Sequence, residues 1–405
     1  MTKKTLGYWF DYSCPYAYVG SLGVEALAER AGAELVWEPM LLGGVFRAIG
    51  TDQKLFATLA PAKAKHNAED MLRWAEAAGV KLSMPADHPF RTVEALRATL
   101  LTKNDPKVIH GFFEAYWVHN RPVSDEATMR DVLTTAGHDP DSILPRLKEA
   151  KDDLIARTER AIALGIFGAP AYQVGDRFYW GQDRAHFAEA ALTGKTAPLP
   201  GAPAESETPS KEHTLEVFWD FSSPFSYLGV TQVEALAKRT GCKVIWKPML
   251  LGGLFRAIGM ADLPLSTWPA PKQRYYAKDM NDWSTFWNVP FAFPSRFPTN
   301  SLKAMRLYLA LPEEARAAYR NATYEAYWAH DRDLTDDAVL AELLGEHYEA
   351  AVAAAATSEV KNALKENTEE AAKRGVFGAP TFIVDGEQLY WGQDRIGLVQ
   401  AALSK

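Results

Sequence analysis

The sequence has 405 residues, of which 47% are hydrophobic and 23% charged, and its formal net charge is −7. This composition is typical of globular domains and excludes a chain that is disordered over most of its length. The acidic balance argues against a nucleic-acid-binding protein, which needs a concentrated basic surface. The length predicts two or more domains.

Cysteine is rare, with only Cys14 and Cys242, which excludes a disulfide framework and a cysteine-rich metal site. The first residues lack the apolar segment of a secretory signal, and no apolar run approaches the roughly 20 residues that span a bilayer. We therefore expect a soluble, cytoplasmic protein that binds neither membrane nor metal.

The chain contains an internal duplication with an offset of about 210 residues. Residues 39–50 recur as 248–259 with one change, Leu254 for Val45. The shorter matches pair 114–117 with 325–328, 167–170 with 377–380, and 179–184 with 390–395. We predict two homologous domains, 1–194 and 214–405, which form a pseudo-dimer within one chain, compatible with a monomeric chain. The proline-rich segment 195–213 is expected to be an exposed, semi-stiff linker.

The elements of each copy follow one order, which is clearest in the second. An aromatic and β-branched run at 215–220 predicts a buried strand, and 227–238 has helical spacing that ends at Gly241. A second strand at 243–246 makes a right-handed parallel βαβ unit the favoured topology. A helical block follows, then a hairpin with an Asp-Gly turn and a closing helix at 395–403. Each copy is therefore predicted to be an α/β domain: βαβ, a helical insertion, then ββα.

This order resembles the thioredoxin fold of the DsbA type. Five segments are more specific and resemble 2-hydroxychromene-2-carboxylate isomerase and kappa-class glutathione transferase: 220–228, 250–253, 297–306, 375–380 and 391–395. The resemblance covers nearly all of both repeats. It implies glutathione as cofactor, bound at the first strand–helix junction, and an aromatic carboxylate as substrate.

Ser223 is the residue that the resemblance places opposite the glutathione sulfur. A helix N-terminus favours an anionic sulfur, and a hydroxyl there can donate a hydrogen bond to it. Without the resemblance, a serine at this position is more simply interpreted as the N-cap of the following helix. No histidine base lies nearby in sequence, so a hydrolase-style nucleophile is poorly supported.

Cys14 is the equivalent residue of the first copy and the best redox or nucleophile candidate of the chain. We expect the helix N-terminus to lower the pKa of its thiol and favour the thiolate. Ala17 stands where a second cysteine would be needed, so an internal dithiol cycle is excluded. Cys242 is expected to be a buried core thiol.

The resemblance also assigns glutathione contacts in both copies. Pro170 and Pro380 would be cis prolines that face the site, although a plain strand-start proline fits the pattern as well. The preceding backbone would pair with the cysteinyl part of glutathione, and the Gln-Asp-Arg turn would receive its γ-glutamyl ammonium. The assigned residues are Ala169, Pro170, Asp183 and Arg184 in the first copy, and Ala379, Pro380, Gln393, Asp394 and Arg395 in the second. Asp183 and Asp394 are equally natural helix-capping residues.

Lys63 and Lys272 are candidates for a carboxylate of glutathione or substrate, although solvated lysines are the commoner case. Candidates for stacking on an aromatic substrate are Tyr16, Trp180, Phe225 and Trp391, with Trp9 and Trp219 beside them. His119 and His330 recur in the two copies, but no metal-ligand spacing accompanies them, so a surface or packing role is expected.

Two departures from the family pattern weaken the assignment. Relatives often carry a glutathione-contacting Asn where this chain has Thr51 and Met260. The first copy also replaces residues 299–301 by Phe90, Arg91 and Thr92, which puts its site in more doubt.

Three functions remain open from the sequence. The leading hypothesis is a glutathione-dependent isomerase of the 2-hydroxychromene-2-carboxylate type, active in the degradation of aromatic compounds. The second is a monothiol oxidoreductase or glutathione transferase that uses Cys14. The third is a non-catalytic module whose cleft captures peptides.

Overall fold

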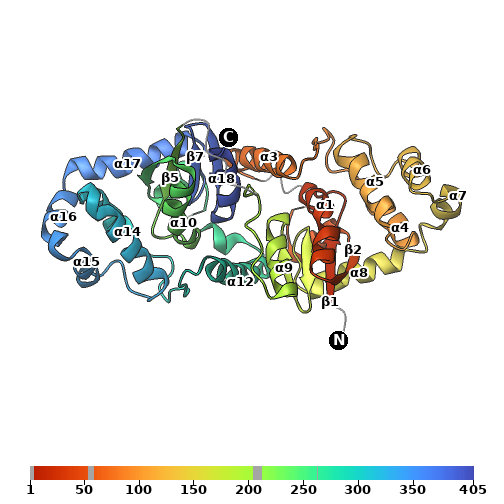
Figure 1. Ribbon diagram of the computed structural model, residues 1–405, viewed down its shortest axis with the longest axis horizontal. Coiled ribbons are helices and arrows are strands. Elements are labelled where there is room, and N and C mark those ends of the chain that lie inside the picture. The colour runs from red at the N-terminus through yellow and green to blue at the C-terminus, as the bar shows by residue number, and fades with distance from the viewer. Residues whose placement is uncertain (1–3, 53–58, 204–211, 262) are drawn as a thin grey trace. The chain divides into compact units, whose positions relative to one another are not determined.

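The computed structural model describes residues 4–52, 59–203, 212–261 and 263–405 (Figure 1). It contains two four-stranded sheets with equivalent strand orders, β2-β1-β3-β4 and β6-β5-β7-β8. In each sheet the first βαβ unit supplies a parallel pair, and the later hairpin adds two antiparallel strands. The predicted α/β architecture is confirmed in both copies.

The first copy has these elements in chain order: β1 (Lys4–Phe10), α1 (Pro15–Arg30), β2 (Ala33–Pro39), α2 (Leu42–Ile49), α3 (Pro61–Ala77), α4 (Val93–Leu101), α5 (Pro106–Trp117), α6 (Glu126–Thr135), α7 (Pro140–Ile143), η2 (Leu144–Arg146), α8 (Lys151–Ala163), β3 (Ala171–Val174), β4 (Arg177–Trp180), η3 (Gln182–Arg184) and α9 (Ala185–Thr193).

The second copy repeats the order with small changes of length: β5 (Thr214–Trp219), α10 (Pro224–Thr240), β6 (Lys243–Pro248), α11 (Leu251–Ala257), η4 (Pro264–Thr267), α12 (Ala270–Trp287), α13 (Leu302–Ala310), α14 (Glu313–Trp328), α15 (Asp337–Leu344), η5 (Gly345–His347), α16 (Tyr348–Ala355), α17 (Ser358–Lys373), β7 (Thr381–Val384), β8 (Gln388–Trp391), η6 (Gln393–Arg395) and α18 (Ile396–Leu403).

Strand β5 is central in its sheet and lies between β6 and β7. Its last five residues are buried, as expected for a strand that is covered on both faces. Helix α10 packs on α18 (Figure 1), and α11 packs on α17. Phe218 and Ile383 of the sheet meet Leu254 of α11 in one apolar cluster. The carboxyl end of β5, where the chain turns into α10, is thereby fixed from several sides.

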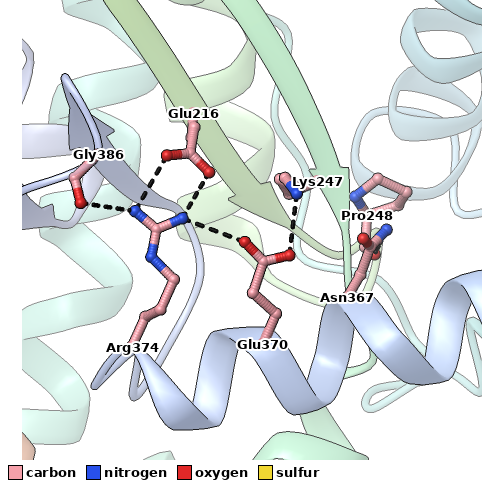
Figure 2. A network of polar contacts seen from close by, with 7 residues as sticks. All are labelled: Glu216, Lys247, Pro248, Asn367, Glu370, Arg374 and Gly386. Carbon is pink, nitrogen blue, oxygen red and sulfur yellow. Dashed lines mark hydrogen bonds and ion pairs between the residues drawn. The ribbon is translucent and has the colours of Figure 1, made fainter.

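Helix α17 is also tied to the sheet by a polar network (Figure 2). The Arg374 guanidinium pairs with Glu216 of β5 and with Glu370. Glu370 in turn pairs with Lys247 of β6 at 2.9 Å. These contacts hold the register of α17 against β5, which leads into the turn, and against β6 beside it.

The linker differs from its prediction at both described ends. Ala197 and His213 are buried, so the expectation of an exposed segment is wrong at these two residues. His213 is held by Asp385, whose carboxylate also accepts the Thr214 N–H at 3.0 Å. Residues 204–211 of the predicted linker lie outside the described part of the chain.

The chain divides into two compact units, and each includes a short segment from the other repeat. Unit 1 comprises Met1–Leu59, Asn67–Pro200 and Pro269–Arg274. Unit 2 comprises Ala60–His66, Gly201–Trp268 and Tyr275–Lys405. The amino-terminal turns of α3 and α12 are thus exchanged, which the sequence did not predict. Within the described ranges, no helix is both long and apolar enough to span a membrane.

Candidate functional site

Ser223 is the N-cap of α10, at the turn that follows β5. Its hydroxyl oxygen accepts a hydrogen bond from the Ser226 N–H at 3.1 Å, and the hydroxyl donates to the Ala379 carbonyl at 2.9 Å. Pro224 opens the helix, where its missing N–H costs nothing. The capping role expected from residue type is confirmed, and the same side chain reaches the loop that the resemblance had paired with it.

Cys14 is the N-cap residue of α1, but its side chain makes no capping hydrogen bond. Its thiol donates to the Ala169 carbonyl at 3.0 Å, and only 8% of the residue is exposed. Burial raises the pKa of Cys14 to about 12, although the N–H groups of Ala17 and Tyr16 act in the opposite direction. The expectation that the thiolate is favoured is therefore wrong for the free protein, because lost solvation outweighs the helix terminus.

The two prolines of the Gly-Ala-Pro segments follow cis peptide bonds, Ala169–Pro170 and Ala379–Pro380, as the resemblance implied. The carbonyls of Ala169 and Ala379 are the acceptors for Cys14 and Ser223. Each turn and its proline loop therefore lie in direct contact.

A buried aspartate under each turn was not predicted as a site residue. Asp220 accepts hydrogen bonds from Ser222 N at 2.9 Å and from Leu251 N at 2.7 Å. Burial raises the pKa of its carboxyl, and these N–H donors partly offset the effect. Asp11 is held in the same way by Ser13 and Leu42. The available signal was an Asp at the end of the same strand in both copies.

These aspartates join three segments of each site. The Asp220 carboxylate accepts hydrogen bonds from the turn that follows β5 and from the start of α11. It also accepts one from the Ser301 hydroxyl, which belongs to the helical insertion. In the first copy Thr92 takes the place of Ser301. The Thr92 substitution that had put the first site in doubt therefore retains the hydroxyl that matters for this contact.

The Gln-Asp-Arg turns are short 3-10 helices, η3 and η6. Asp394 pairs with Arg395 at 3.1 Å, and Asp183 pairs with Arg184 at 3.0 Å. Gly392, at a φ of 106°, leaves no room for a Cβ, which would lie 2.5 Å from the Asp394 carboxylate. The glycine thus lets the carboxylate fold back over the turn. Gln393 is buried beside it.

Lys63 and Lys272 lie over the tryptophans that end the hairpins. The Lys63 ammonium is 5.4 Å from the centre of the Trp391 ring, within unit 2. The Lys272 ammonium is also 5.4 Å from the Trp180 ring, within unit 1. The structure therefore groups Lys272 with the Cys14 turn and Lys63 with the Ser223 turn.

The aromatic candidates separate into two groups. Trp9 and Trp219 are fully buried and serve the core, so neither can stack on a substrate. The remaining four are partly exposed and stay candidates: Tyr16, Trp180, Phe225 and Trp391.

Other residues that the sequence had singled out lie away from the turns. His119 and His330 are on the surface, as expected. Cys242 is a buried thiol, also as expected. Met260 packs against the apolar cluster of the second copy. Within the described residues, no three His, Cys, Asp or Glu side chains are grouped for a metal ion.

These features define a thioredoxin-fold protein with two strand–helix turns, each facing a cis-proline loop. A family model described as the DSBA-like thioredoxin domain matches residues 5–193 and again residues 214–404. The chain therefore belongs to the DSBA-like thioredoxin family, as a tandem duplication.

Its relatives narrow this assignment. The chain is 30% identical over 193 residues to 2-hydroxychromene-2-carboxylate isomerase of Sphingobium xenophagum, covering 47% of this chain and 97% of the relative. It is 29% identical over 209 residues to glutathione S-transferase kappa 1 of Homo sapiens, covering 47% and 91%. A solved 2-hydroxychromene-2-carboxylate isomerase matches with 26% identity and a TM-score of 0.40, covering 47% of this chain and 94% of that structure. The resemblance seen in the sequence is confirmed at the level of the family.

Proposed function

We propose that the protein is a glutathione-dependent isomerase that acts on unsaturated aromatic keto acids of the 2-hydroxychromene-2-carboxylate type. The observation that carries the proposal is the Ser223 hydroxyl, placed at a helix N-terminus and 2.9 Å from the carbonyl of a cis-proline loop. Relatives named as 2-hydroxychromene-2-carboxylate isomerases and kappa glutathione transferases support the choice of reaction and cofactor.

Glutathione would lie between the Ser223 turn and the Ala379–Pro380 loop. The Ser223 hydroxyl now donates to the Ala379 carbonyl, so it must turn to donate to a thiolate. An anionic sulfur is the better acceptor because charge strengthens the hydrogen bond. The dipole of α10, a helix of 17 residues, favours the same charge.

The remaining contacts follow from charge. Asp394, with Gln393 and Arg395 in the same turn, is assigned to the γ-glutamyl end, where a carboxylate suits an ammonium. Asp183 and Arg184 take the equivalent place in the first copy, beside Ala169 and Pro170. Lys272 is assigned to a ligand carboxylate.

The reaction needs no acid–base chemistry from Ser223. The ring of 2-hydroxychromene-2-carboxylate must open at the bond between the ring oxygen and C2, and the hemiketal proton passes to the phenol oxygen as the ketone forms. The glutathione thiolate adds to the conjugated double bond, the carbon–carbon bond of the open adduct becomes single and rotates, and the thiolate leaves as the double bond reforms. The protein contributes orientation and stabilisation of the sulfur anion. Phe225 and Trp391 are the partly exposed rings of this copy that are available for an aromatic substrate.

Calorimetry with glutathione tests the cofactor, and ultraviolet spectroscopy of 2-hydroxychromene-2-carboxylate tests the reaction. We expect binding, and turnover that requires glutathione. Absence of both overturns the proposal.

A second candidate function is thiol chemistry at Cys14, which is favoured by the match between its 3.0 Å contact to Ala169 and that of Ser223 to Ala379. The Cys14 thiolate would attack oxidised glutathione, forming a mixed disulfide and releasing one glutathione thiolate. Mass spectrometry detects the adduct, and its loss in Cys14→Ser together with activity would favour this candidate over the first.

A further inference from the structure

The exchanged segments bring a lysine to the site of the opposite repeat. Lys63 belongs to the first repeat by sequence, yet it lies within unit 2, and Lys272 lies within unit 1. Each ammonium is 5.4 Å from the ring of the tryptophan that ends the hairpin, Trp391 or Trp180. The same lysine–tryptophan distance occurs in both copies, so this contact is a shared feature of the two repeats.

These tryptophans border the cis-proline loops. A Cβ on Gly378 would lie 2.4 Å from the Trp391 indole nitrogen, and one on Gly168 would lie 2.5 Å from that of Trp180. Gly378 directly precedes Ala379, whose carbonyl accepts a hydrogen bond from the Ser223 hydroxyl. A single aromatic ring therefore separates the Lys63 ammonium from the loop that holds Ser223.

His66 fixes the exchanged segment in unit 2. Its Nε2 accepts a hydrogen bond from the Trp391 N–H at 3.1 Å, and its ring packs on Phe377 at a centroid distance of 5.3 Å. Trp391 ends β8, which is the edge strand of its sheet. The imidazole thus occupies a backbone donor that the sheet leaves open, and it anchors Lys63 one helical turn away.

The Lys63 ammonium lies over an aromatic ring and has no anionic partner among the described residues. The side chain is half-buried, and no described carboxylate lies within ion-pair distance of it. Burial lowers the pKa of this lysine, as expected when a charge is desolvated without compensation. A carboxylate from a ligand would supply that compensation.

We propose that Lys63 binds a carboxylate of the ligand held at the Ser223 turn, and that Lys272 does the same at the Cys14 turn. The identity of the ligand, glutathione or an acidic substrate, rests on the proposed function. The crossed assignment does not, since it follows from the contacts alone. Each turn then depends on a segment encoded in the other repeat.

Alkylation with a matched pair of reagents tests the crossed assignment without glutathione. Iodoacetate carries a carboxylate and iodoacetamide does not. In both cases the thiolate forms a carbon–sulfur bond and iodide leaves. The ratio of the two rate constants therefore reports positive charge near the thiol. Ser223→Cys places a thiol at the second turn, so one chain presents both sites and mass spectrometry of peptides resolves them.

Lys63→Met should lower the iodoacetate to iodoacetamide ratio about fivefold at the thiol introduced by Ser223→Cys, and leave the ratio at Cys14 unchanged. Lys272→Met should do the reverse. The effect should shrink in 0.5 M salt, where the screening length falls to about 4 Å. Lys63→Arg and Lys272→Arg should restore the ratios because they keep the charge.

The opposite pattern, in which each lysine affects the thiol of its own repeat, overturns the proposal, and so does an unchanged ratio at both thiols. Iodoacetamide rates report the fold, since unfolding would raise them at both thiols. If a Met variant unfolds, Lys63→Gln and Lys272→Gln replace it. Failure of glutathione to bind would refute the proposed function while leaving these ratios intact.

Discussion

The two strand–helix turns share one backbone arrangement but surround it with different side chains. In the second copy hydroxyls form a chain: Ser223 accepts from Ser226 N, and Ser226 Oγ lies 2.8 Å from the Tyr324 hydroxyl. Tyr324 in turn donates to the Asp220 carbonyl at 3.0 Å. In the first copy the places of Ser226 and Tyr324 are taken by Ala17 and Phe113, both fully buried.

The features common to both turns are those that position the backbone. Each retains the buried aspartate, the cis proline and an indole that donates to the turn, Trp117 to Tyr12 and Trp328 to Phe221, both at 2.8 Å. The features that differ are the side chains around the turn. Duplication has preserved the scaffold, while one turn is surrounded by hydroxyls and the other by a buried thiol and apolar side chains.

The largest expected difference is in the reactivity of Cys14. Because burial raises its pKa from 9.0 to about 12, iodoacetamide should react about 1,000-fold more slowly with native Cys14 at pH 8 than with the unfolded chain. The native rate should continue to rise with pH toward 12. Stability should fall over the same range, because the unfolded state loses its proton first. Cys14→Ser should remove the part of that fall that comes from the thiol, while the buried tyrosines, whose pKa values are also raised, keep the rest.

Peptide-resolved mass spectrometry measures the rate, with Cys242 as an internal reference. A native Cys14 that reacts as fast as an unfolded thiol near pH 7 would show that burial does not raise its pKa, and a faster reaction would support the thiolate predicted from the sequence.

Under the proposed function, Ser223→Ala should lower kcat/KM for glutathione-dependent isomerisation about 100-fold, because it removes the hydroxyl that turns to donate to the sulfur anion. Loss of the helix cap should also cost about 1 kcal/mol of stability. Cys14→Ala is the matched control and should retain most of the activity. Equal losses in both variants, measured by ultraviolet turnover, would show that the two turns do not differ in this role.

Local sequence pattern was sufficient for much of the site. The strand that precedes the turn, the Gly241 helix end and the Asp-Gly hairpin were all predicted, because each depends on the conformational preferences of adjacent residues. Pairing of Ser223 with the Ala379–Pro380 loop came from family resemblance. The grouping of Lys272 with Trp180 was not predicted, since it depends on which distant segment packs there. The burial of Cys14 was missed for the same reason.

A second contrast lies where the long insertion helix meets the sheet. Glu38 of β2 pairs with Arg157 at 2.6 Å and with Arg160 of α8. In the second copy the equivalent pair is reversed in sign, Lys247 with Glu370 (Figure 2). The position therefore requires opposite charges rather than a particular residue.

Glu38→Lys should destabilise the first copy by about 2 kcal/mol, because it places a third cation beside two arginines in a partly buried position. Adding Arg160→Glu recreates the pair of the second copy and should recover about half of the loss, since Arg157 remains. Urea unfolding followed by tryptophan fluorescence measures both changes. A single variant as stable as the parent would mean that the ion pair contributes nothing.

The smallest expected effect concerns the loops before the helical insertions. In the first copy His88 Nδ1 lies 2.9 Å from the Tyr116 hydroxyl, which also accepts the Phe90 N–H at 2.8 Å. In the second copy Phe297 replaces His88, and Tyr327 donates to the Arg296 carbonyl instead. Between pH 7 and 5, the first loop is therefore expected to respond to pH more strongly than the second.

Burial lowers the pKa of His88 below 6.5, so the folded state holds the imidazole neutral. The unfolded chain takes up the proton first as the pH falls through about 6.5, and stability is lost until the folded pKa is reached. His88→Phe should cost about 1 kcal/mol at pH 7.5, through the lost hydrogen bond. It should also flatten the pH dependence of the free energy of unfolding between pH 7 and 5.

His119→Phe, at an exposed position, is the control and should leave the pH dependence unchanged. If the His88 variant keeps the full acid sensitivity of the parent, another group is responsible and the loops of the two copies do not differ in this respect.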